Sequence, residues 1–201
     1  MKKFLAKQPL IRDINVIDLI LIDHRFIKEC VETLTHHDAD KHLKLTVAKG
    51  FFEALQQHSD AERQVVYTKL ESLENFHFNI LEAQAEHANV DGMIKLLRPK
   101  TAHAKILRDE LEAELKVLAE LVKHHIKEEE SELLPRMAEE LDDETLRILG
   151  DEFMKTRKMT LHDLENYPQL QDELVSWKDD VQKVSSQFLS KMDKYVENLK
   201  H

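Results

Sequence analysis

Apolar residues recur every three or four positions along most of the chain, which is the spacing of a buried stripe on an α-helix. The first stripe predicts a helix over about residues 13 to 36, with Asp13 as its N-cap, and consists of Ile17, Ile20, Ile27, Val31 and Leu34. Later stripes predict a second helix that ends near residue 73 and further helices over about 75–97, 101–137, 143–165 and 170–199. The pattern therefore predicts an all-α protein.

Polar and helix-breaking residues set the predicted boundaries. A polar stretch at 37–40 separates the first two helices, and Pro99 is expected to end the third. The second helix has a competing interpretation, because Ser59-Asp60-Ala61-Glu62 has the pattern of a capping box. That interpretation would end one helix at Ser59 and use Glu62 to cap the next.

The apolar positions of the last predicted helix alternate in steps of four and three. Such a long apolar seam is too large to leave in water, so we expect the helix to pack along the bundle or to pair with its copy in a homodimer. The predicted organisation is a tail at 1–12, a helical domain at 13–165 and an amphipathic C-terminal helix at 166–201.

The composition agrees with long helices and excludes some classes of binding partner. Of 201 residues, 34% are charged, and only three are Gly and four Pro. The net charge of −10 argues against nucleic acid or an anionic membrane as a partner. Cys30 is the only cysteine, so no intrachain disulfide is expected, and no segment resembles a signal peptide or a membrane span. We expect a cytoplasmic protein.

Two stretches carry a histidine and a glutamate four residues apart within an apolar stripe. His58 and Glu62 form one pair, and His125 and Glu129 form the other. Residues i and i+4 lie about 6 Å apart on one face of a helix, so each pair can reach one metal ion together. Laying His58 on His125 also brings apolar positions into agreement, which indicates a duplicated helical hairpin.

A single histidine precedes each pair on the helix before it. His24 and His87 both lie on apolar stripes, so an antiparallel four-helix bundle would bring them to the level of the two pairs. Burying these groups without a cation would cost several kcal/mol, because no basic residue lies on the same faces. The predicted metal ligands are His24, His58, Glu62, His87, His125 and Glu129.

The neighbouring residues His124 and Glu128 have the same spacing as His125 and Glu129. They lie on the more polar side of the helix with Glu120, so we choose His125 and Glu129. His77 stays open, because it lies near the face of His87 but away from the level of the metal. The remaining histidines are predicted surface residues: His36, His37, His42, His103, His162 and His201.

As a set, these motifs resemble the hemerythrin-like HHE cation-binding domain family. The resemblance covers about residues 13–160 and rests on Asp23-His24, the stretch from His58 to Tyr67, Glu86-His87, and His125 to Pro135. It implies an antiparallel four-helix bundle around a non-haem di-iron centre with an oxo or hydroxo bridge, with Glu62 and Glu129 bridging and the histidines terminal. Zinc or manganese would also suit these ligand types. A ferritin-like centre would need two Glu-x-x-His boxes, and only Glu74 to His77 has that spacing.

Two positions differ from the oxygen-carrying members of that family. Ala83 stands where they have a fifth histidine, and Glu129 stands where they have aspartate. The sequence is closer to members with four histidines and two glutamates, which resemble iron–sulfur cluster repair and nitric-oxide-response proteins, although it lacks their cysteine-containing domain.

This resemblance implies a protein that binds or reacts with oxygen, peroxide or nitric oxide, or that handles iron. Whether it is an enzyme stays open at the level of the sequence. The alternative is a structural or sensor bundle, in which the metal serves folding and the C-terminal helix binds a partner.

Overall fold

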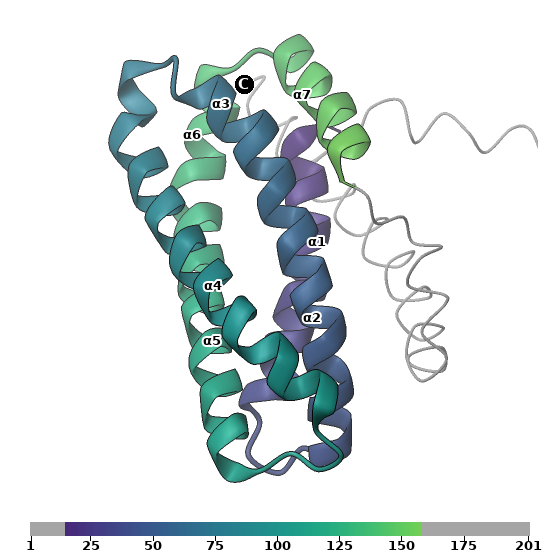
Figure 1. Ribbon diagram of the computed structural model, residues 1–201. Helices are drawn as coiled ribbons and strands as arrows, with labels where there is room; N and C mark the ends of the chain where they lie inside the picture. The colour runs from purple at the N-terminus through teal and green to yellow at the C-terminus, as the bar shows by residue number, and fades with distance from the viewer. Residues whose placement is uncertain (1–14, 158–201) are drawn as a thin grey trace, which may run out of the picture. The chain divides into compact units, whose positions relative to one another are not determined.

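The computed structural model describes residues 15–157, and its described secondary structure is entirely helical (Figure 1). Two of the long helices, α1 and α4, each pack against both of the other two, α2 and α5, so the four surround one core. Loops join them at alternating ends of the bundle (Figure 1). The predicted all-α bundle is confirmed, and its long helices are α1 (Val16–Thr35), α2 (Lys41–Ala61), α4 (His77–His103) and α5 (Asp109–Glu128).

Shorter elements extend or follow these helices. Two of them are π-helices, each of which continues a long helix without a break. The elements are η2 (Glu62–Tyr67) and α3 (Thr68–Leu70) after α2, the 3-10 turn η3 (Glu74–Phe76) before α4, η4 (Glu129–Leu133) and α6 (Leu134–Glu140) after α5, and finally α7 (Asp143–Thr156).

The chain divides into two compact units, Met1–Lys158 and Met159–His201, and the described residues belong to the first. The predicted tail at 1–12 and the predicted helix at 170–199, with its packing or dimer role, lie outside the described residues. α7 ends at Thr156, before the predicted end near residue 165, because Arg157 has an extended backbone. Within residues 15–157, no helix combines the length and apolar character needed to cross a membrane.

α1 begins at Val16, and its N-cap is Asn15 in place of the predicted Asp13. The side-chain oxygen of Asn15 accepts hydrogen bonds from the backbone N–H groups of Ile17 and Asp18. In return, the Asp18 carboxylate accepts the N–H of Asn15 at 3.0 Å. This is a reciprocal capping box built from Asn and Asp, a variant of the Ser/Thr and Glu/Gln pattern.

The second helical segment runs through Ser59 without a break, so the competing capping-box interpretation is wrong. The backbone N–H of Glu62 donates to the carbonyl oxygens of His58 and Ser59, and Ser59 itself is buried. The helix does change at this point, because its turns widen into the π-helix η2 from Glu62 onward.

The prediction that Pro99 ends the third helix is wrong, because α4 continues to His103. Proline removes one backbone hydrogen bond, but side chains hold the last turn in place. The Arg98 guanidinium bonds to two side chains of α2, and Thr101 is buried with its hydroxyl donating to the Arg98 carbonyl oxygen. The fourth segment consequently begins at Asp109, later than the predicted start near 101.

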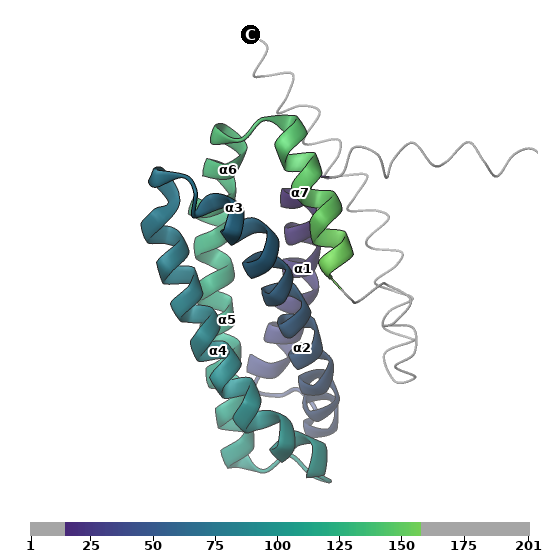
Figure 2. The same ribbon diagram turned by 45° about the horizontal axis from the view of Figure 1, so that its top comes forward.

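α7 lies against α1 and η2 and covers one side of the bundle (Figure 2). Gly150 permits the close approach, because a Cβ at this position would lie 3.1 Å from backbone atoms of Asn15 and Val16. Phe153 of α7 is fully buried, and its ring centroid lies 6.3 Å from that of His58. The apolar face of α7 thus reaches the level of the histidines.

Candidate metal centre

The six side chains predicted as metal ligands are all buried, with exposed fractions between 0% and 6%. They come from four helical segments but lie close together in space. They are His24 on α1, His58 on α2, Glu62 as the first residue of η2, His87 on α4, His125 on α5 and Glu129 as the first residue of η4.

The four imidazoles form two pairs, one from each helical hairpin. The ring centroids of His24 and His58 lie 4.9 Å apart, and those of His87 and His125 lie 4.6 Å apart. In the second pair, the two Nε2 atoms are separated by 2.8 Å. Each hairpin therefore brings two ring nitrogens to the middle of the bundle.

The carboxylate of Glu62 lies between the two imidazole pairs. Its Oε2 atom is 3.2 Å from Nε2 of His58, which belongs to the first pair. The same oxygen is 3.5 Å from Nε2 of His87, which belongs to the second pair. The carboxylate of Glu62 can therefore bind a metal ion together with either imidazole pair.

Glu129 occupies the corresponding place from the other hairpin. Its Oε2 atom is 3.1 Å from Nε2 of His24 and 3.4 Å from Nε2 of His125. The potential ligand atoms fall into two groups, in each of which all atoms lie within 4.8 Å of one another. The groups are His24, His58, Glu62 and Glu129, and Glu62, His87 and His125.

Both glutamates begin a π-helix, and each stands four residues after a site histidine. The backbone hydrogen bonds of a π-helix join residues five apart instead of four, and single π turns inside α-helices are frequently found at functional sites. The recurrence of this rare element at Glu62 and at Glu129 supports the duplicated hairpin that the sequence indicates.

Two further carboxylates hold the outer nitrogens of site histidines. Asp23 Oδ2 lies 3.4 Å from Nδ1 of His58, and Glu86 Oε2 lies 2.7 Å from Nδ1 of His125. A carboxylate that accepts the Nδ1 proton leaves the Nε2 lone pair free for a metal. Sequence analysis gave these acids no role, although each directly precedes a site histidine and so marks the repeat.

Glu130 serves the third imidazole in the same way. Its Oε1 atom lies 3.2 Å from Nδ1 of His24 and accepts a hydrogen bond from the ammonium group of Lys28 at 2.8 Å. The Nδ1 atom of His87 has no hydrogen-bond partner among the described residues. Three of the four histidines are therefore oriented by a carboxylate.

Tyr67 is a site residue that the sequence analysis missed. Its hydroxyl donates a hydrogen bond of 2.9 Å to Oε1 of Glu129 and lies 3.3 Å from Nε2 of His87. The side chain is fully buried, and burial raises the pKa of its hydroxyl well above the ordinary value, so Tyr67 keeps its proton. A signal existed in the sequence, because the matching position of the second hairpin is the apolar Leu134.

The two buried glutamates of the site differ in the direction of their pKa shifts. Burial raises the pKa of Glu62 well above its ordinary value, and the charge of Glu129 raises it further. Burial opposes ionisation of Glu129 as well, but the imidazoles of His125 and His24 outweigh it and lower the pKa. Burial lowers the pKa of His87 to about 2. Without a cation, burial therefore favours the neutral form of Glu62, whereas the imidazoles favour the ionised form of Glu129.

Several buried atoms in the middle of the site have no hydrogen-bond partner among the described residues. They are Nε2 of His24 and of His58, both carboxylate oxygens of Glu62 and Oε2 of Glu129. Buried polar atoms are normally bonded, because each unpaired one costs about 1–3 kcal/mol. Imidazole nitrogen and carboxylate oxygen are ligands of divalent first-row metals. The residues present therefore fit a metal ion.

A largely buried ion pair connects Arg157, the residue that follows α7, to the site. Arg157 Nη2 lies 2.5 Å from Oδ1 of Asp23, the carboxylate that also contacts His58. We expect Arg157→Ala to lower the free energy of unfolding by about 3 kcal/mol, because Asp23 would keep a buried charge without its cation. Urea unfolding measures the change.

A matched control lies on α7, which ends one residue before Arg157. Arg147 is exposed and lies 3.9 Å from Asp151, so Arg147→Ala is expected to cost less than about 0.5 kcal/mol. Adding Asp23→Asn to Arg157→Ala should recover part of the lost stability. Equal losses for the two arginine variants would show that Asp23 does not depend on Arg157.

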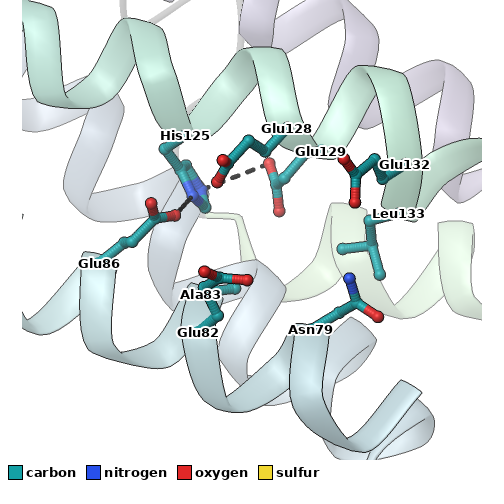
Figure 3. Close-up of a pocket in the computed structure, with 9 residues that line it drawn as sticks. All are labelled: Asn79, Glu82, Ala83, Glu86, His125, Glu128, Glu129, Glu132 and Leu133. Atoms are coloured by element: carbon teal, nitrogen blue, oxygen red, sulfur yellow. Dashed lines mark hydrogen bonds and ion pairs between the residues drawn. The ribbon is translucent and has the colours of Figure 1, made fainter. Parts of the chain in front are cut away.

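A cavity of about 190 Å³ lies between α4 and the joined segment of α5 and η4 (Figure 3). Its wall includes the buried site residues His125 and Glu129 and the exposed residues Glu82 and Glu132, so it leads from the surface to the site. Ala83 contributes only a methyl group to this wall. The space beside His125 is therefore open.

The remaining histidines of the described residues lie away from this site. The side chain of His124 is 62% exposed and pairs with Glu128, as expected for a residue on the polar side of its helix. His77 is exposed, as are His36, His37, His42 and His103, while His162 and His201 lie outside the described residues. Cys30 is a buried free thiol.

Comparison with known families gives one match. The model of the hemerythrin HHE cation binding domain matches residues 15–137, which is more than half of the chain. The matched range includes all six buried site residues. The search of curated proteins and the search of solved structures each gave no match.

Proposed function

The chain belongs to the hemerythrin HHE cation-binding domain family, and we propose that its cation is a pair of iron ions bound by His24, His58, Glu62, His87, His125 and Glu129. The observation that carries this proposal is the position of the two carboxylates. Glu62 and Glu129 each lie within 3.5 Å of an imidazole from both pairs, so each can bridge two ions. His24 and His58 would hold one ion, and His87 and His125 the other.

The donor set favours iron over harder cations. Four imidazole nitrogens and two carboxylates suit first-row transition metals, whereas magnesium and calcium take oxygen ligands. Zinc and manganese share these ligand types, so the identity of the metal is the part of the proposal that elemental analysis decides. A pair of iron ions would supply the redox chemistry that the side chains lack.

We infer further that the centre binds or reacts with a small ligand such as oxygen, peroxide or nitric oxide. The cavity beside Ala83 gives a molecule of that size access to His125 and Glu129. The hydroxyl of Tyr67 donates a hydrogen bond of 2.9 Å to Oε1 of Glu129, so it can orient that carboxylate within the site. On the opposite side, Phe153 packs near His58 and excludes water.

One observation favours a second function, a bundle that uses its metal for folding or sensing. The six buried groups come from all four long helical segments, so one centre would tie the whole bundle together. Metal binding of this kind is coupled to folding. Only the first function predicts that the reduced protein changes its spectrum when it meets oxygen or nitric oxide.

Elemental analysis and a visible spectrum of the purified protein test the proposal directly. We expect about two iron ions per chain and an absorption that chelation removes. Chelation should also lower the melting temperature by about 5–10 °C, because a ligand present at a hundred times its Kd stabilises a protein by about 2.7 kcal/mol. A protein without bound metal, whose melting temperature does not respond to a chelator or to added Fe²⁺, would refute it.

A further inference from the structure

The cavity between α4 and α5–η4 is lined mainly by carboxylates. Of its nine lining residues, five are glutamates and none is lysine or arginine. Two of the glutamates, Glu82 and Glu132, are exposed, and their side chains form no hydrogen bond or ion pair with the rest of residues 15–157. A concave wall of one charge focuses the electric field and raises the local concentration of counter-ions.

A group of potential metal ligands apart from the buried six lies at the cavity, and two of its three members belong to the cavity wall. Glu86, His124 and Glu128 each offer an atom within 4.8 Å of the others. Glu86 and Glu128 line the cavity, and Glu86 also contacts Nδ1 of His125 at 2.7 Å (Figure 3). Glu86 therefore belongs to this outer group and also contacts His125 of the buried centre.

The inner end of the cavity independently points to a cation. Glu129 lines it, is 3% exposed and leaves Oε2 without a hydrogen-bond partner among the described residues. A cation that moves inward along this wall meets carboxylates along the whole path.

We propose that this cavity is the route by which divalent cations enter the buried site, and that Glu86, His124 and Glu128 form a transit site at its mouth. The inference rests on the proposed function, because it requires the buried centre to bind metal. The charge of the wall selects the occupant: carboxylates attract a divalent cation, repel anions and give no advantage to a neutral gas.

The test measures the rate at which metal-free protein takes up Co²⁺, whose visible absorption reports binding, in stopped-flow mixing. Glu82→Gln with Glu132→Gln removes two wall charges that have no structural partner. We expect the uptake rate to fall on the order of tenfold at low ionic strength. The deficit should shrink in about 1 M salt, where the Debye length is only about 3 Å. The final Co²⁺ content should equal that of the unmodified protein.

Glu32→Gln with Glu152→Gln is the matched control. Both residues are exposed and lie on α1 and α7, away from the cavity. Their substitution changes the net charge by the same amount as the cavity variant does. We expect this control to change the uptake rate less than twofold. Glu128→Gln removes a carboxylate of the transit site and should slow uptake as the cavity variant does.

The outcomes separate this inference from the proposed function. If the unmodified protein takes up no Co²⁺, both fail together. If it takes up Co²⁺ and the cavity variant loads as fast as the control at low salt, only the entry route is wrong. A cavity variant with a lower final content at an unchanged rate would make these glutamates permanent ligands and would also overturn the route.

Discussion

His125→Ala is expected to remove at least one of two metal ions per chain, whereas His124→Ala leaves the equilibrium metal content unchanged. The two residues are neighbours in sequence, but their side chains are 7% and 62% exposed. His125 Nε2 lies 2.8 Å from Nε2 of His87 and 3.4 Å from Oε2 of Glu129, so its loss opens the half of the centre supplied by α4 and α5.

The effect should be large, because changing even the outer partners of metal ligands costs about 10–100-fold in affinity. Elemental analysis after equilibrium loading gives the metal content, and thermal unfolding gives the accompanying loss of stability. The His124 variant controls for removal of an imidazole from the same helix. Equal metal contents in the two variants would mean that His125 is not a ligand.

Ala83→His is expected to change the reaction of the reduced protein with oxygen. In the unmodified protein we expect irreversible oxidation, with no stable spectrum that disappears on deoxygenation. Ala83 lines the cavity beside His125, so an imidazole there would bring a nitrogen ligand to the side of the centre that the small ligand reaches. The variant should shift the protein toward reversible oxygen binding, measured by visible spectra during cycles of oxygenation and deoxygenation.

Ala83→Leu separates the chemistry of the imidazole from its bulk. Leucine fills the same space without a nitrogen, so it should slow oxidation on the order of tenfold, which corresponds to about 1.4 kcal/mol in the barrier, without changing the product. If the histidine and leucine variants give the same spectra, position 83 controls access alone. A reversible oxygen spectrum in the unmodified protein would contradict the role given to Ala83.

The burial of the six candidate ligands could be predicted because each lies on an apolar stripe. A polar residue at a position that the helical period places inside must be satisfied there, and His24 and His87 are visible on that ground alone. The same argument separated His125 from His124. The periodicity of one helix is local information, and it was sufficient for these residues.

The surroundings of the histidines depend on contacts between helices, which a periodic pattern does not contain. Asp23 belongs to α1 but orients His58 on α2, and Glu86 belongs to α4 but orients His125 on α5. The prediction of where α4 ends was wrong for a related reason. Contacts with α2 stabilise the last turn of the helix beyond Pro99.

The duplicated hairpin relates the two halves of the centre, and the position of Tyr67 shows where that relation is broken. An exchange of the two halves places His58 on His125 and Glu62 on Glu129, yet it places the hydroxyl of Tyr67 on the apolar side chain of Leu134. The phenol and the cavity both lie at the half that contains His125, while Phe153 closes the other half. Two metal ions bound at these positions would therefore be chemically distinct, and the proposed centre would have a reactive end and a structural end.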